Sequence, residues 1–349
     1  MKKALIFSLA GLLVAAPALA GVAKKSKTNV AFQKFGTFSV TSTSKVTPDM
    51  QWTNSVSEFK GKGLTGGLIG KTLLRPGDTG QIIDLPASSV ATLDNKKKEY
   101  TVAPIKKLSE EIEEAKKEAK TEPEAKEEPP STIKVTKNEF KVEDTGEEST
   151  INNFACHKYI VLWLTEWEDT QTGEKGSSRL ETAVWTTPIS DTLREAQAEE
   201  MKFSKAYLAK IGVDMEPAQR DMLGTSWLTM LDAFGRPGAK PKQDYSKTAA
   251  EIQKIQGYPI VIDGRYDVKG TKPQAAAGTE TAEGEEESSK DVKGAIGGFL
   301  KKSLKKKPAD TAPKADEPTL TYRIETLEIS TPSLSAADFQ VPAGYKKKG

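Results

Sequence analysis

The chain of 349 residues carries 51 Lys and Arg against 49 Asp and Glu, and its formal net charge of +2 gives no electrostatic reason to expect nucleic-acid binding. One Cys and one His exclude an intrachain disulfide, a cysteine-rich zinc or iron–sulfur site and a histidine-rich metal centre. We therefore expect no cofactor. The length allows one or two domains, and 36% apolar residues can supply them with a core.

The first twenty residues predict an export signal. Lys2 and Lys3 precede an apolar stretch from Ala4 to Ala16, and Ala18-Leu19-Ala20 fits a signal-peptidase site. A helix of about 13 residues rises only about 20 Å, short of the roughly 30 Å hydrocarbon core, which argues against an uncleaved anchor. We expect a signal peptide over residues 1–20, cleavage after Ala20, and a periplasmic or secreted protein.

Residues 31–104 predict a meander of short antiparallel strands. Trp52 and Val56 alternate with polar residues, Leu85-Pro86 separates two apolar runs, and Asp94-Asn95-Lys96 is typical of a turn. Strand signals return over residues 131–187. There the run Cys156–Trp167 has apolar residues on both faces, so we expect this strand to be covered on both sides.

Residues 190–257 predict helices. Ser190 or Asp191 can cap the first helix and Gly212 can end it. Its expected apolar stripe is Leu193, Ala196, Met201, Ser204, Leu208 and Ile211. A second helix is expected from Pro217 to Gly235 and a third from Thr248 to Gly257. Strands follow over 258–268 and 319–329, and a change of apolar parity at Glu325 or Thr326 predicts a β-bulge in the last strand.

Two charged insertions interrupt this pattern, at residues 105–130 and 269–318. The first holds 15 charged residues, and the second is acidic over 280–287 and basic over Lys290–Lys307. Apolar residues in the basic part share one helical face, so Lys290–Lys307 could contact an anionic membrane surface. A solvated, self-compensating acidic and basic arm is the alternative, and the sequence leaves both open.

Catalytic motifs are weak. Cys156 and His157 are neighbours on a predicted strand, so their side chains point to opposite faces and cannot form a nucleophile–base pair. The segment Gly66–Thr72 imitates a phosphate-binding loop, but the spacing of its glycines is one residue short. We expect no catalytic residue and no metal site, although a hydrolase that uses only carboxyl groups stays open.

Large apolar side chains suggest a ligand cavity instead. Met and Trp adapt to irregular acyl chains, and a curved sheet roofed by helices would enclose such a cavity. The predicted ligand-binding residues are Trp163, Trp185, Trp227, Met230 and Phe234. The competing interpretation is that these residues form an ordinary filled core.

Four stretches carry a resemblance to a known family: Ile82–Leu85 with Leu93–Val102, Asn152–Tyr159, Gln256–Ile260 and Phe339–Lys346. The chain resembles a family of exported bacterial proteins of unknown function whose domain is similar to the outer-membrane lipoprotein carriers LolA and LolB. The resemblance implies a strongly curved antiparallel sheet with helices on its concave face and no catalytic residues. Carriers of that fold hold acyl chains between the sheet and the helices.

We therefore expect an α+β protein: an open half-barrel of about nine to eleven antiparallel strands with helices packed on the concave face. Residues 21–345 would form a single domain, interrupted by the two insertions. The expected function is non-enzymatic binding or carriage of an apolar or lipid-like ligand, such as a lipoprotein acyl chain, in the periplasm. The alternative is a cell-envelope interaction or scaffold protein without a small-molecule ligand.

Overall fold

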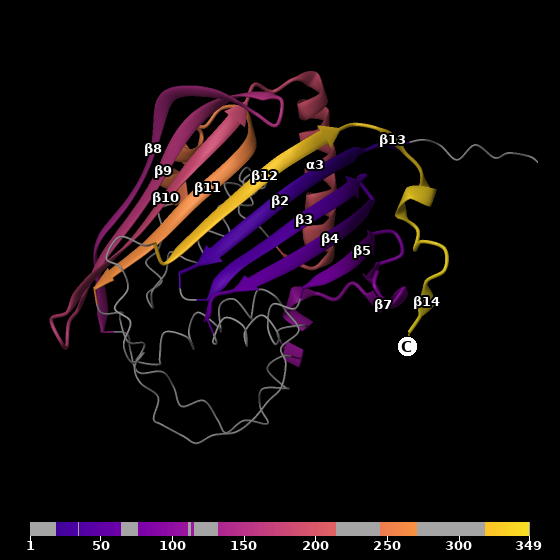
Figure 1. The fold of residues 1–349 in the computed structure, drawn as a ribbon, viewed down its shortest axis with the longest axis horizontal. Coiled ribbons are helices and arrows are strands. Elements are labelled where there is room, and N and C mark those ends of the chain that lie inside the picture. Colours follow the sequence, from indigo (N-terminus) through magenta and orange to yellow (C-terminus); the bar gives the residue numbers. More distant parts are fainter. Residues whose placement is uncertain are drawn as a thin grey trace, which may run out of the picture.

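The computed structural model describes residues 19–33, 35–63, 76–110, 113–114, 132–213, 245–270 and 318–348. They form a broad, open, twisted sheet of twelve strands in the order β14-β7-β6-β5-β4-β3-β2-β12-β11-β10-β9-β8 (Figure 1). All neighbours pair antiparallel except the two-residue strand β14, which pairs parallel to β7. The eleven other strands fit the expected antiparallel sheet.

The N-terminal strands are β1 Leu19–Ala20, β2 Val22–Phe32, β3 Gly36–Val46, β4 Met50–Gly61, β5 Gly77–Asp84, β6 Ser89–Asp94 and β7 Glu99–Pro104. The remaining elements are β8 Ile133–Ile151, β9 Phe154–Asp169, β10 Lys175–Thr187, helix α3 Asp191–Lys210, helix α6 Tyr245–Ile252, β11 Tyr258–Gly270, β12 Leu320–Ser330, β13 Ser333–Leu334, the 3₁₀-helix η2 Ala336–Phe339 and β14 Lys346–Lys347. The short strand β1 pairs with β13 in a separate two-stranded sheet.

The expected meander over residues 31–104 is confirmed, because β3 to β7 pair antiparallel in chain order. Asn152 and Asn153 both have positive φ and join the long strands β8 and β9, which is the conformation that a two-residue hairpin turn requires. The predicted bulge in β12 is also present. The pairing of β12 with β2 shifts between Thr326 and Glu328, so the extra residue is Leu327, just beyond the expected position.

Helices α3 and α6 both pack on one face of the sheet, which we call the helix-bearing face. Ala196 and Phe203 of α3 pack against Val22, Val46 and Ile83. Ile252, the last residue of α6, belongs to the cluster of Trp163, Leu180 and Tyr322. Side chains alternate along β2, so Val22 of the first cluster and Val30, which packs against the second, lie on the same side. Figure 1 views the sheet from its opposite face, with α3 behind the strands.

Helix α3 begins and ends where the sequence indicates. Ser190 accepts a hydrogen bond from the backbone N–H of Leu193 at 3.3 Å, and Asp191 lies in the first turn, where the helix dipole favours an acid. Gly212 adopts a φ of +71° just after the helix. The buried face differs in part from the expected stripe: it runs through Leu193, Ala196 and Phe203.

The opposite face is partly covered by the end of the chain, residues 333–347, which we call the C-terminal strap. Its Leu334 and Phe339 are buried in a cluster with Ile82 and Leu93, and Val341 and Tyr345 pack against it. Lys45 of β3 pairs with Asp338 of the strap at 2.8 Å, and the Tyr345 hydroxyl donates to Asn95 at 2.8 Å. The strap therefore holds β4 to β7 from the side that the helices leave free.

Strand β9 is covered less evenly than the sequence suggests. Tyr159, Val161, Trp163, Thr165 and Trp167 are buried on the helix-bearing face, whereas Ile160, Leu162 and Leu164 on the opposite face are half-buried. Charged residues of the neighbouring strands flank this second row: Glu139, Lys141 and Glu143 on β8, and Arg179 and Glu181 on β10. Long charged side chains can shield apolar neighbours with their aliphatic stems, so a second layer of protein is not required there.

Three expectations fall on residues outside the described ranges. They are the signal peptide up to residue 18, the helix over 217–235, and nearly all of the second insertion, including Lys290–Lys307. Only the first part of the insertion at 105–130 is described.

Candidate ligand-binding face of the sheet

The strand register sorts the helix-bearing face into rows of side chains that run across the sheet. Two neighbouring rows are apolar. One contains Val161, Thr182, Gly264, Tyr322, Val30, Phe38 and Phe59, and the next contains Trp163, Leu180, Tyr266, Leu320 and Phe32. Most of these side chains are buried from β9 to β12 and half-buried in β2 to β4.

Polar atoms within the apolar rows have hydrogen-bond partners. The Tyr322 hydroxyl lies 2.7 Å from that of Thr182, and burial raises the pKa of Tyr322 although Thr182 partly opposes the shift. The Trp163 indole N–H donates to Asn138 at 2.8 Å, and its ring meets Phe140 edge-on at 5.8 Å. This part of the face is a packed core with satisfied polar groups.

Beyond a mixed row of Ile324, Thr28, Val40 and Ser57, the next two rows toward α3 are rich in hydroxyl groups. One contains Ser26, Ser42, Ser55 and Thr79, and the other contains Lys24, Ser44, Thr53, Gln81 and Thr92. These side chains are half-buried or exposed, so a ligand can reach them. The Ser42 and Ser55 hydroxyls lie 2.9 Å apart, but Ser26, Ser44 and Thr53 have no hydrogen bond to a side chain in the part of the chain that the structure describes.

An apolar row beyond these hydroxyls closes the face. It contains Val22, Val46, Ile83 and Val90 with Gln51 of β4 between them, and its apolar residues lie beneath Ala196 and Phe203 of α3. The helix-bearing face therefore changes from apolar, to hydroxyl-rich, to apolar again. Such a surface matches a molecule with both a polar and an apolar part.

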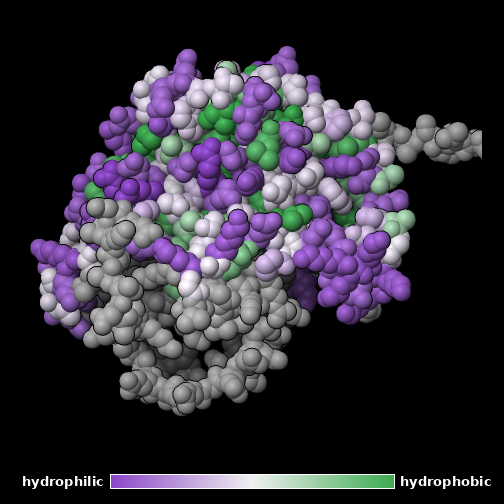
Figure 2. Space-filling view, in the orientation of Figure 1, coloured by the Kyte–Doolittle hydropathy of each residue, from purple (hydrophilic) through white to green (hydrophobic). Residues whose placement is uncertain are grey.

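Charged groups are concentrated on the opposite face. Arg179 pairs with Glu181 on β10, and Arg323 bridges Asp263 and Glu325 at 2.8 Å each. Figure 2 shows this face as a broad hydrophilic surface with small hydrophobic areas between the charges. The difference between the two faces follows from the alternation of side chains along each strand.

Lys24 is a charged residue of the helix-bearing face. It lies in a hydroxyl row of the helix-bearing face and pairs with Glu200 of α3 at 2.9 Å, and its ammonium also donates to the Tyr258 hydroxyl at 3.3 Å. Burial by itself lowers the pKa of Lys24, but the charge of Glu200 and the contact with Tyr258 outweigh it and raise the pKa above the ordinary lysine value. The side chain is charged at neutral pH and still 26% exposed.

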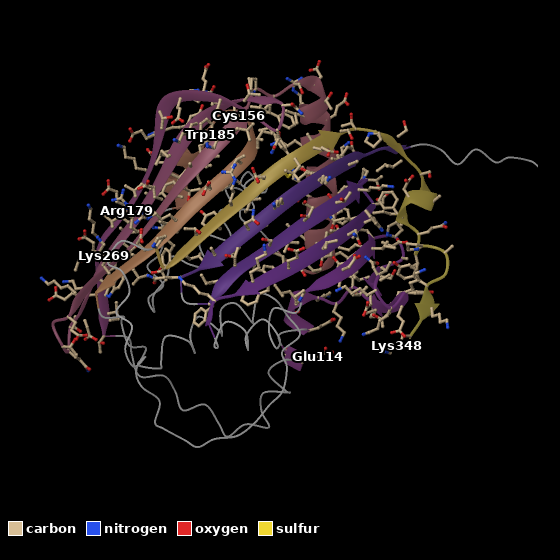
Figure 3. The ribbon with its side chains drawn as sticks, in the orientation of Figure 1. Glu114, Cys156, Arg179, Trp185, Lys269 and Lys348 are labelled. Atoms are coloured by element: carbon tan, nitrogen blue, oxygen red, sulfur yellow. The ribbon has the colours of Figure 1, made fainter. Side chains whose placement is uncertain are left out.

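The two predicted ligand-binding residues that the structure describes lie on opposite faces. Trp163 faces the helices, directly across from Leu180. Trp185 directly follows the helix-facing Val184, so it points the other way, and the ammonium of Lys158 lies 5.2 Å from its ring centroid. Figure 3 labels Trp185 and Arg179, which share this face of β10. The two tryptophans cannot line one cavity, whereas Trp227, Met230 and Phe234 lie outside the described residues.

Sequence reasoning missed the residues that distinguish this face, namely Lys24 and the serines and threonines around it. Their signal was visible only as a hydroxyl-rich stretch, because neither spacing nor residue type shows which hydroxyls share a face until the register of β2 to β5 is known.

The only thiol and imidazole are held in separate environments. Cys156 is buried, which raises the pKa of its thiol and makes it unreactive. His157 is partly exposed and contacts Asp144 at 2.6 Å. The described residues contain no group of three His, Cys, Asp or Glu side chains that could hold a metal ion.

Comparison of the chain with models of known protein families gives no match, and comparison with curated proteins and with solved structures gives none either. The likeness to the lipoprotein carriers therefore rests on the sequence stretches alone. Among the helices that the structure describes, none combines the length and hydrophobicity that crossing a bilayer requires.

Proposed function

We propose that the protein binds an amphipathic, lipid-like ligand on the helix-bearing face without chemical turnover, and that this face is the concave side of the sheet. The observation that carries the proposal is the succession of apolar and hydroxyl rows on a face where strands β2 to β5 and β9 to β12 place one Lys or Arg, Lys24. The ligand would lie between the sheet and its covering helices. Export to the periplasm and the resemblance to acyl-chain carriers, both inferred from the sequence, agree with this proposal.

The energetics favour a ligand with a long apolar chain. Each methylene group that leaves water for the apolar rows contributes about 0.8 kcal/mol, so a chain of several methylenes outweighs the loss of translational freedom. Hydroxyl groups such as those of Ser44 and Thr53 can then hydrogen-bond the polar end, which would otherwise resist burial. A purely polar ligand would gain nothing from the apolar rows.

The first test is the lipid content of protein purified without detergent. Native mass spectrometry or solvent extraction should recover a lipid, and stripped protein should enhance the emission of a dansylated fatty acid. Failure to recover a lipid, together with no uptake of the probe, would contradict ligand carriage and favour the envelope scaffold.

Adjacent residues of β3 provide a matched pair of variants. Val40 lies on the helix-bearing face and Thr41 on the opposite face, and both are half-buried. Val40→Gln places an amide in the proposed acyl path and should weaken probe binding about tenfold, since it removes burial of apolar atoms and adds a desolvation cost. Thr41→Gln should leave probe binding unchanged. Circular dichroism and a thermal melt check that both variants fold.

A further inference from the structure

We propose that the polar end of the ligand is an anion and that Lys24 binds it. This inference rests on the proposed function and specifies the ligand as an anionic amphiphile with a carboxylate or phosphate head. The structural basis is a basic side chain that lies between an apolar region and a set of unengaged hydroxyls.

The position of Lys24 favours contact with a ligand over contact with bulk solvent. Among the helix-facing residues of strands β2 to β5 and β9 to β12, it is the only Lys or Arg, whereas its neighbours Lys25 and Lys27 both point to the opposite face. An ammonium group has three N–H donors. Glu200 and the Tyr258 hydroxyl account for two of the donors, and the described residues supply no acceptor for the third.

Serine side chains neighbour Lys24 on the same face of the sheet. Ser44 is the direct cross-strand partner of Lys24, and Ser26 follows it along the same face of β2. Cross-strand partners have their Cβ atoms about 5 Å apart, so one anionic head can reach Lys24 and Ser44 together. Because an oxyanion accepts several hydrogen bonds, this group of one cation and nearby hydroxyls suits it better than it suits a neutral alcohol.

Ile329 indicates the direction in which the apolar chain of the ligand extends. It is the cross-strand partner of Lys24 on β12, and it packs with Val22 against α3. A ligand whose head lies on Lys24 and Ser44 therefore has apolar residues within reach on the β12 side.

Glu200 competes with the ligand for the same ammonium. Its carboxylate is 28% exposed, so it can rotate toward water when an anion arrives. Lys24 then exchanges its ion pair with Glu200 for one with the ligand. Removing the Glu200 charge should therefore strengthen binding of an anionic ligand, while removing Lys24 should abolish the preference for it.

The experiment compares decanoate, decyl phosphate and decan-1-ol, which share one chain length and differ in the head, through displacement of the neutral probe 1-N-phenylnaphthylamine. We expect the wild-type protein to bind at least one of the anions about tenfold more tightly than the alcohol. The stronger of the two anions identifies a carboxylate or a phosphate head. Lys24→Met should bring the ratio of the alcohol Kd to the anion Kd close to one without weakening binding of the alcohol. Glu200→Gln should raise this ratio.

Lys25→Met is the matched control, because Lys25 is adjacent in the chain but points to the opposite face beside Glu328; its ratio should equal that of the wild type. The double variant Lys24→Met/Glu200→Gln leaves no unpaired charge under α3 and checks that a lost preference is not caused by a displaced helix. A ratio that survives Lys24→Met, or a wild-type protein that binds the alcohol as well as the anions, overturns the assignment of Lys24 while leaving lipid binding intact. No displacement by any of the three compounds overturns the proposed function as well.

Discussion

The hydroxyl groups of Tyr322 on β12 and Thr182 on β10 lie 2.7 Å apart, although strand β11 runs between them. Gly264 makes this contact possible, because it is the cross-strand partner of both residues and has no side chain. The Tyr322 ring fills the space where a Cβ atom of residue 264 would be. One aromatic side chain thus ties three strands together beneath the helices.

Tyr322→Phe should destabilise the protein by about 1–3 kcal/mol, since it leaves the buried Thr182 hydroxyl without its partner. Urea unfolding measures the loss. Adding Thr182→Val removes the unpaired hydroxyl and should restore part of the stability. If the loss of stability in the double variant equals the sum of the two single losses, the two hydroxyls do not act as a pair.

Gly264→Ala should be more damaging than its size suggests. The new methyl group would overlap the ring of Tyr322, and the overlap can be relieved only if the ring leaves its place between β10 and β12. We expect a loss of about 1–3 kcal/mol, the usual cost of overpacking. The same substitution at Gly146, whose surroundings are open, is the control, with only the strain of its positive φ to oppose it.

The C-terminal strap should loosen in acid. The ion pair with Lys45, together with hydrogen bonds from Ser335, lowers the pKa of Asp338 from 3.8 to about 2. A carboxyl group with a depressed folded-state pKa contributes stability above its unfolded value, and that stability is lost as the pH falls through the folded value. The strap contribution of Asp338 should therefore be complete above pH 4 and fade toward pH 2.

Trp52 reports this release, because it packs in the same cluster as Phe339 and the Lys45 ammonium lies 5.8 Å from its ring. Its fluorescence should change between pH 4 and pH 2 in the wild type. In Asp338→Asn the change over this interval should be smaller, since the strap is already weakened at neutral pH. Equal acid transitions in both proteins would show that Asp338 does not anchor the strap.

The sequence predicted the strands well because alternation and turn residues are local. The hairpin at Asn152 and Asn153 and the bulge near Thr326 were also local signals. The stripe of α3 was predicted only in part, because Glu200 occupies a position on its buried side and a charged residue does not indicate burial. Its partner, Lys24, is 176 residues away, and no local pattern connects the two.

The candidate site depended on information of another kind. Trp163 and Trp185 were grouped by residue type, but the strand register decides which face each occupies. Trp163 lies across from Leu180 on the helix-bearing face, and Trp185 directly follows Val184 and so points to the opposite face. The register across β12, β2 and β3 then decides that Lys24, Ser44 and Ser26 share a surface. Register is a long-range property in this sheet, so composition alone cannot show which residues share a surface.

The exposed edge of the sheet offers the last prediction. β8 is an edge strand, and the backbone N–H of Val142 donates to the Glu251 carboxylate of α6 at 2.8 Å. A free edge N–H can pair with another chain, so this carboxylate protects the edge as well as docking α6. The ion pair with Lys254 and the hydrogen bond from Val142 lower the pKa of Glu251, which keeps the acceptor charged at neutral pH.

Glu251→Ala should raise the hydrogen-exchange rate of the Val142 amide by about tenfold or more and increase aggregation on concentration, because the edge loses its acceptor. Glu251→Gln keeps an acceptor oxygen and should show a smaller effect on both measurements. Exchange of an amide in the middle of β10, which is paired on both sides, provides the internal reference. If Glu251→Ala leaves the Val142 amide as protected as in the wild type, the carboxylate does not guard this edge and the charged side chains along β8 must do so alone.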